Sequence, residues 1–160
     1  MIAPPAGFYE IPTLSARAAW VAQKPVQAFC ATSDSVWQAY IASIGGLPSG
    51  VTSVFGYTPT VGGDSTYLAP ATCATITLRL QKRRVSLPTL GAALDVVTHE
   101  SLHMRGLTDE GVTECDAIHT LPSFLVARWG FRKGSPAYTR VLYGATNFHK
   151  RLPPQYQTVC

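Results

Sequence analysis

The chain has 160 residues, of which 46% are hydrophobic and only 14% are charged, so we expect one domain (residues 1–160) with a buried core rather than a disordered chain. The net charge of +4 is mild, and the only basic run, Lys82-Arg83-Arg84, has no interleaved aromatic residues, so we expect no nucleic-acid partner. No stretch approaches the ~20 apolar residues of a membrane span, so we expect no membrane-embedded segment.

The cysteines are even in number and widely spread, at Cys30, Cys73, Cys115 and Cys160. They form no CxxC pair of the kind found in zinc ribbons and redox sites, so we expect two disulfides, with three connectivities open. The alternative is four buried free thiols in a reducing compartment. No basic region followed by an apolar run opens the chain, which predicts no signal peptide. The cysteines favour a mature secreted, extracellular domain over a cytoplasmic protein.

Residues 14–24 have a helical composition and end at Pro25. Residues 32–34 then offer an N-cap for a helix whose apolar side chains repeat with helical spacing up to Ile44, where Gly45-Gly46 ends it.

Residues 51–70 are rich in strand-forming side chains, and Gly62-Gly63-Asp64 supplies a turn. This pattern predicts a small β-hairpin or two short strands. Tyr67-Leu68-Ala69 is the candidate edge strand, which could hold an extended peptide by backbone hydrogen bonds. Residues 72–81 fit either a helix or a strand, because they contain a β-branched run.

Pro88 opens the strongest predicted helix, which ends at Gly106. Thr108 can cap the next helix, which runs to His119 or beyond until Pro122 disturbs it. A last helix begins at Ser135-Pro136 and stops before Pro153-Pro154. Together these elements predict an α+β fold that is mainly helical, with a small β-hairpin or edge strand.

The strongest functional signal is the segment from His99 to His103, which lies on the helix that Pro88 opens. Residues four apart lie on one face of an α-helix, so both imidazoles can reach one divalent ion. Glu100 lies about 100° further round the helix, where it can reach a water on the ion without being a ligand itself. This is the HExxH pattern of zinc peptidases. We therefore predict His99 and His103 as zinc ligands and Glu100 as the catalytic residue.

A hydrolytic zinc site usually has a third protein ligand and one open position. Asp109 fits the HExxHxxGxxD form of some metzincins, but those proteins need a downstream methionine and this chain has only Met1 and Met104. Asp109 and Glu110 would also occupy a helix start, where acidic side chains are favoured. Glu114 lies a turn inside that helix among apolar residues, and a carboxylate there is costly unless paired or bound to metal. Glu114 is the predicted third ligand, with Asp109 and Glu110 as alternatives.

The arrangement resembles the gluzincins, in which a glutamate on the helix after HExxH completes the zinc site. It is also similar to a family of short secreted bacterial proteins with the pattern HExxHxxGxxxExxxEC, matched here by His99, Glu100, His103, Gly106, Glu110, Glu114 and Cys115. The spread of the other cysteines and the short segments 30–33 and 68–70 are similar as well. The resemblance implies a zincin-like metallopeptidase and supplies no substrate.

The sequence therefore predicts a monomeric zinc-dependent peptidase that acts on a peptide or protein substrate. Zinc would activate a bound water, and Glu100 would accept the proton of that water and pass it to the leaving amine. A further side chain would stabilise the oxyanion, and the candidates are His119, His149, Tyr138, Tyr143 and Arg140.

Two alternatives stay open at this point. The first is a non-catalytic secreted binding module in which zinc only stabilises the fold and the hairpin meets a protein partner. The second is hydrolysis of a non-peptide amide, such as a cell-wall crosslink, which the HExxH pattern also allows.

Overall fold

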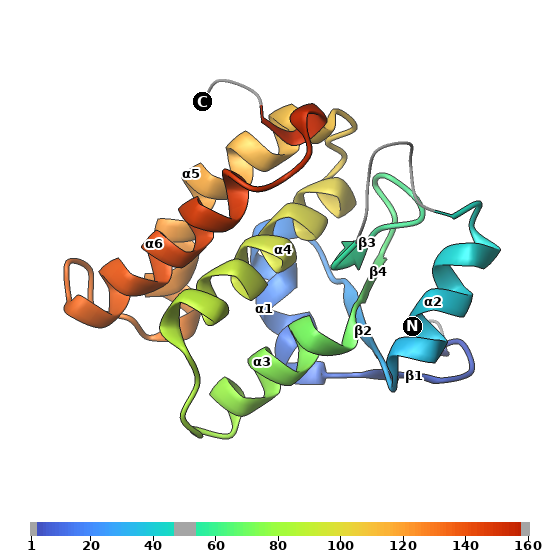
Figure 1. Cartoon of the computed structure of the whole chain (residues 1–160), viewed down its shortest axis with the longest axis horizontal. Coiled ribbons are helices and arrows are strands. Elements are labelled where there is room, and N and C mark those ends of the chain that lie inside the picture. The colour runs from blue at the N-terminus through green and yellow to red at the C-terminus, as the bar shows by residue number, and fades with distance from the viewer. Residues whose placement is uncertain (1–2, 47–53, 158–160) are drawn as a thin grey trace.

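The computed structural model describes residues 3–46 and 54–157. Within these ranges a small mixed sheet lies beside a set of helices arranged around one central helix, α4 (Figure 1). The α+β, mainly helical single domain predicted from the sequence is confirmed. In chain order the elements are β1 (Phe8–Glu10), α1 (Pro12–Ala22), β2 (Gln27–Ala31), α2 (Asp34–Ser43), β3 (Gly56–Tyr57), β4 (Ser65–Leu68), α3 (Pro70–Leu80), α4 (Leu87–Arg105), α5 (Glu110–Trp129), α6 (Pro136–His149) and the 3-10 helix η1 (Pro154–Tyr156).

The strands of the sheet are ordered β1-β2-β4-β3. Strands β3 and β4 pair antiparallel, with Gly56 opposite Leu68, so the predicted hairpin is confirmed, while residues 51–53 of the predicted strand region lie outside the described residues. The prediction that Tyr67-Leu68-Ala69 forms an edge strand is wrong, because β4 also pairs in parallel with β2. The edge beside β4 belongs to β3.

Strand β2 was not predicted from the sequence. All five of its residues are buried, so it lacks the alternation of polar and apolar side chains that marks a half-exposed strand. It pairs antiparallel with β1 and parallel with β4, which makes it interior to the sheet. Because β2 was not predicted, β4 had no expected partner on that side and was predicted to be an edge strand.

The helices predicted at residues 14–24, 36–44 and 136 onward are present as α1, α2 and α6. The backbone N–H of Val36 donates to the side chain of Ser33, and that of Tyr138 donates to Ser135, so both predicted caps form. The ambiguous stretch after Pro70 is the helix α3.

Helix α5 differs from expectation at two points. Asp109, rather than Thr108, caps its start by accepting a hydrogen bond from the Val112 N–H. The helix also continues through Pro122 instead of ending there. A proline removes one backbone hydrogen bond, but Leu121 and Phe124 on either side are fully buried. This burial offsets the lost hydrogen bond.

Helix α4 crosses the centre of the molecule, with α5 and α6 on one side and the sheet on the other (Figure 1). Two glycines bring α4 and α6 into backbone contact. A Cβ added at Gly91 would clash with the carbonyl oxygen of Val141, and one added at Gly144 would clash with the backbone of Pro88. The close approach fixes α6 along α4, and at the end of α6 His149 contacts Glu114.

A disulfide joins Cys30 on β2 to Cys73 on α3, which confirms one bridge of the expected pair. No cysteine among the described residues is free, and Cys160 lies outside them. A structural disulfide is typical of proteins in oxidising compartments, and secretion itself stays a prediction.

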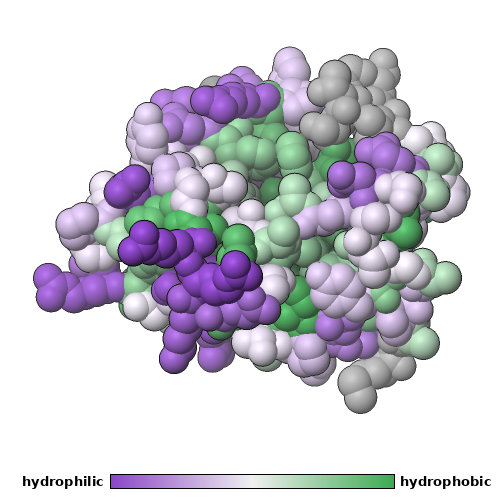
Figure 2. Space-filling view, turned by 60° about the horizontal axis from the view of Figure 1, so that its bottom comes forward, coloured by the Kyte–Doolittle hydropathy of each residue, from purple (hydrophilic) through white to green (hydrophobic). Residues whose placement is uncertain are grey.

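No helix in the described part of the chain combines the length and apolar character needed to span a bilayer. The face drawn in Figure 2 carries its hydrophilic residues in several groups, with hydrophobic residues exposed between them.

Candidate metal centre

Helices α4 and α5 form a hairpin that brings the predicted ligands together. His99 and His103 lie one turn apart near the end of α4, and both are buried. Gly106 ends the helix with φ of +119°, a backbone conformation that favours glycine. After the short connection, Asp109 caps α5 and Glu110 is its first residue. The tight turn therefore directs the start of α5 back toward the two imidazoles.

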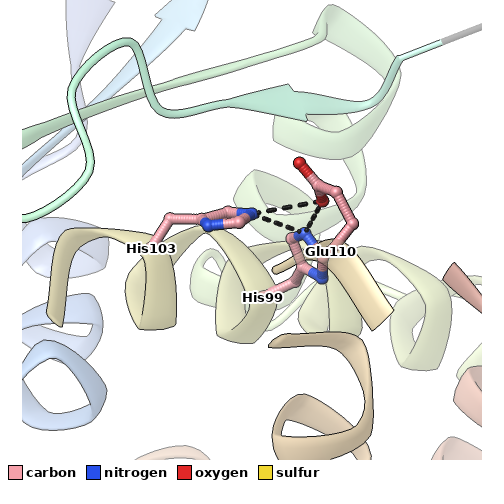
Figure 3. A group of neighbouring side chains, drawn as sticks. All are labelled: His99, His103 and Glu110. Atoms are coloured by element: carbon pink, nitrogen blue, oxygen red, sulfur yellow. Dashed lines mark hydrogen bonds and ion pairs between the residues drawn. The ribbon is translucent and has the colours of Figure 1, made fainter. Parts of the chain in front are cut away.

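Glu110 points at both histidines (Figure 3). Its Oε2 lies 3.0 Å from Nε2 of His99 and 3.3 Å from Nε2 of His103, and the two Nε2 atoms are 2.9 Å apart. One potential ligand atom from each residue lies within 4.8 Å of the others, so the three side chains could hold a metal ion.

The remaining ring nitrogens fix the tautomers of the two histidines. Nδ1 of His103 lies 2.8 Å from the carbonyl oxygen of Leu107, and Nδ1 of His99 lies 2.9 Å from Oε2 of Glu114. A carbonyl or carboxylate oxygen only accepts, so each Nδ1 carries the hydrogen. Both Nε2 lone pairs then face the Glu110 carboxylate. Three electron-rich atoms, the two Nε2 atoms and Oε2 of Glu110, therefore lie close together and repel one another unless a proton or a metal ion lies between them. The donor set therefore fits a cation.

The electrostatics of the cluster agree with that conclusion. Burial lowers the pKa of His99, but hydrogen bonds with Glu110 and Glu114 outweigh it and raise the pKa to about 10. The pKa of His103 is also raised, because its hydrogen bond with Glu110 and the charge of Glu100 outweigh burial. Burial acts to raise the pKa of Glu110, yet its hydrogen bonds with His103 and His99 lower that pKa to about 2. Without metal, the cluster thus retains a proton.

Glu114, the predicted third ligand, lies on the opposite side of the His99 ring from Glu110. Its carboxylate is buried as expected, but it contacts His99 from the Nδ1 side and accepts a second hydrogen bond from Nδ1 of His149 at 3.0 Å. Two imidazoles therefore satisfy the buried charge, and no metal is required to explain it. This geometry favours Glu110, one of the alternatives, over Glu114 as the third ligand. Asp109, the other alternative, is occupied as the cap of α5.

Asp95 extends this buried group one turn back along α4. It is fully buried, and as a carboxylate it would have no hydrogen-bond donor among the described residues. Burial, together with the neighbouring charge of Glu114, raises the pKa of Asp95 well above its ordinary value. In the neutral form Asp95 can donate to Glu114. Glu114 then has donors from Asp95, His99 and His149.

Glu100 lies on a neighbouring face of α4, under strand β3. Its Oε2 accepts a 2.8 Å hydrogen bond from the hydroxyl of Thr58. A Cβ added at Gly56 would lie 2.7 Å from Cγ of Glu100, so only a glycine lets the strand come this close. Burial raises the pKa of Glu100, while the charges of His99 and His103 and the Thr58 hydrogen bond oppose that rise. A carboxyl with a raised pKa beside a metal site is suited to accept and return a proton.

A cavity of about 430 Å³ opens onto these side chains and is lined by Glu100, His99, His103, Glu110 and Tyr156 among others. The ring of Tyr156 lies 5.8 Å from that of His99, centroid to centroid. Burial and the charges of the three glutamates raise the pKa of Tyr156, so its hydroxyl remains a neutral donor.

Tyr156 was not predicted from the sequence, because a tyrosine beyond the last helix matches no motif. The five residues predicted as candidates for the oxyanion donor lie away from the cavity. Tyr138 is in the core, Tyr143, Arg140 and His119 are exposed, and His149 is bound to Glu114. None of the five is among the described residues that line the cavity.

Comparison of the chain with family models, with curated proteins and with solved structures finds no match.

Proposed function

We propose that the protein is a zinc-dependent peptidase in which His99, His103 and Glu110 hold the metal. The observation that carries the proposal is the convergence of these three ligand atoms beside Glu100 in one open cavity. Two imidazoles and one carboxylate are a common ligand set of hydrolytic zinc sites. Magnesium and calcium prefer oxygen ligands alone, which makes zinc the better match.

When bound, zinc would polarise the scissile carbonyl and lower the pKa of a water molecule. Glu100 would accept a proton from the attacking water and return it to the leaving amine. The hydrogen bond from Thr58 orients the Glu100 carboxylate for both steps. Tyr156 is the neutral donor on the cavity wall, and we assign it to the negative charge that develops on the carbonyl oxygen.

Strand β3 is the element against which we expect an extended peptide to bind. It is the last strand in the sheet order, so its side opposite β4 pairs with no strand among the described residues. Tyr57 and Thr58 lie at this edge, and both line the cavity. Backbone hydrogen bonds along the edge would hold the peptide across Glu100.

The test is to strip the protein of metal, restore zinc and follow cleavage of a broad peptide library. The proposal predicts one zinc per chain and cleavage only in the zinc-loaded protein. Glu100→Gln should keep the zinc and lose the cleavage, because the amide has the same shape but cannot accept the proton. Asp116→Asn, which alters an exposed acid on α5, is the matched control.

The same experiment separates the proposal from the non-catalytic zinc-stabilised module. Zinc-dependent folding with no cleavage of any peptide would favour the module. A Glu100→Gln protein that cleaves as fast as the parent would contradict the role of Glu100.

A further inference from the structure

The cavity beside Glu100 has an apolar side that the metal chemistry does not use. This apolar wall is contributed by α2, the residues entering β3, α4 and the end of α6, and it consists of Ile41, Ile44, Val54, Phe55, Val96 and Phe148. No Lys or Arg occurs among the described residues that line the cavity. The charged groups of the cavity are instead gathered at the metal centre.

The apolar wall begins directly beside the catalytic glutamate. Val96 lies one helical turn before Glu100 on α4, and both side chains come within 2.9 Å of a Cβ added at Gly56. The wall and the base thus flank the same point of strand β3. A peptide held along β3 would place one side chain against this wall while its neighbouring peptide bond faces Glu100.

Several contacts hold the wall in place. The carbonyl oxygen of Phe55 accepts hydrogen bonds from the N–H of Ala69 and the hydroxyl of Thr72. The indole N–H of Trp37 donates to the carbonyl oxygen of Val54 at 3.0 Å. The rings of Phe55 and Phe148 meet edge to face, with centroids 5.3 Å apart. The part of the cavity that this apolar wall encloses, the apolar recess, is therefore preorganised, so its side chains need little ordering when a ligand binds.

We infer that this recess selects peptides with a large apolar side chain, such as leucine or phenylalanine, next to the bond that is cleaved. The inference rests on the proposed peptidase function and names its substrate class. The whole cavity, with the apolar wall and the metal centre together, has a volume of about 430 Å³, which is within the range of ligand pockets and leaves room for a large side chain together with the peptide backbone. An acidic side chain would lose its hydration against the apolar wall without gaining a partner.

The test uses acetyl- and amide-blocked hexapeptides of alanine in which one residue is Leu, Phe, Gly or Glu. Binding is measured by calorimetry on the zinc-loaded Glu100→Gln protein, and kcat/KM is measured on the zinc-loaded parent. The inference predicts that the Leu and Phe peptides bind at least about tenfold more tightly than the Gly and Glu peptides.

Two variants locate the selectivity in the apolar wall. Phe148→Ala should reduce the advantage of the Leu and Phe peptides, whereas Tyr143→Ala, on the exposed face of the same helix, should not. Ile44→Lys places a cation at a half-buried position of the wall and should raise the relative affinity for the Glu peptide. Retained zinc and a cooperative unfolding transition establish that each variant is folded.

The outcomes separate this inference from the proposed function. Cleavage without preference among the four peptides would overturn the inference and leave the peptidase function standing. Preferential binding of the Leu and Phe peptides without cleavage would support the recess and overturn the peptidase function. Equal binding of all four peptides, or binding of none, would overturn the inference.

Discussion

Glu114 holds His99 from behind, through a 2.9 Å hydrogen bond between its Oε2 and the Nδ1 of the imidazole, and so turns Nε2 of His99 toward Glu110. A carboxylate behind a metal-binding histidine fixes the ring and makes it a better ligand. The two glutamates on α5 thus have different positions, with Glu110 facing the Nε2 atoms of both histidines and Glu114 facing Nδ1 of His99. In the proposed zinc site Glu110 would be the ligand and Glu114 would support His99.

This division of roles predicts different losses on substitution. Glu114→Gln should weaken zinc binding by roughly 10- to 100-fold while keeping one zinc per chain. Glu110→Gln removes the charged ligand itself and should weaken it further. Competition of each variant with a chromophoric chelator measures the difference. An equal loss in the two variants, or a larger loss in Glu114→Gln, would contradict the assignment.

Zinc affinity should rise with pH. In the metal-free protein the pKa of His99 is raised to about 10, so His99 holds a proton that zinc must displace. Each proton released makes the apparent affinity rise roughly tenfold per pH unit until the pH reaches that pKa. Chelator competition at several pH values between 6 and 9 measures the slope. An affinity independent of pH would show that no proton is displaced.

The same raised pKa makes a prediction for the metal-free fold. A histidine whose folded pKa lies above the unfolded value of about 6.5 stabilises the protein fully below that value. The contribution is lost as the pH rises toward 10. His99→Gln should therefore flatten the alkaline fall in the free energy of unfolding, measured with urea, relative to the parent. His119→Gln, an exposed histidine on α5, is the control.

Thr58→Val should shift the pH dependence of catalysis. The hydroxyl of Thr58 stabilises the ionised form of Glu100, so its loss raises the pKa of that carboxyl. The acid limb of kcat/KM should move to higher pH with zinc binding unchanged. Thr60→Val, at an exposed position of the same loop, should leave the limb in place. No shift in Thr58→Val would mean that the hydrogen bond is absent in the active enzyme.

Tyr156→Phe tests the oxyanion donor. The change removes only the hydroxyl, and loss of one such donor typically lowers kcat by about 10²- to 10³-fold. Zinc affinity and KM should change little, because the ring is kept. Tyr143→Phe, which is exposed on α6, serves as the comparison. An unaltered kcat in Tyr156→Phe would show that another group stabilises the oxyanion.

Gly91→Ala should destabilise the fold, because the added methyl group would meet the carbonyl oxygen of Val141 where α4 and α6 touch. Overpacking of this kind typically costs about 1 to 3 kcal/mol in the free energy of unfolding. Urea unfolding of the metal-free protein measures the loss, with Thr139→Ala on the exposed side of α6 as the control. Equal stability of the two variants would contradict the close contact.

The parts of the molecule that the sequence predicted well are those governed by local rules. The α4 helix begins next to Pro88 and ends at Gly106, and both residues act through their own backbone preferences. The spacing of His99 and His103 follows from the helical period alone. The helix ends and the histidine spacing can be predicted without knowing which residues meet across the fold.

The parts that it missed depend on partners far along the chain. Burial of Glu114 was anticipated, but its partner His149 comes 35 residues later on α6, so metal binding and hydrogen bonding could not be told apart. Glu110 was discounted as an ordinary residue of a helix start, although the turn at Gly106 directs it at the histidines. Tyr156 reaches the site only because the chain returns after α6.

The most direct test of the central claim is a crystal structure of the zinc-loaded Glu100→Gln protein. We expect one anomalous zinc peak, about 2.0 to 2.2 Å from Nε2 of His99, Nε2 of His103 and a carboxylate oxygen of Glu110. Glu114 should remain hydrogen-bonded to Nδ1 of His99. A zinc ion bound to Glu114 in place of Glu110, or no zinc between the two histidines, would contradict the account.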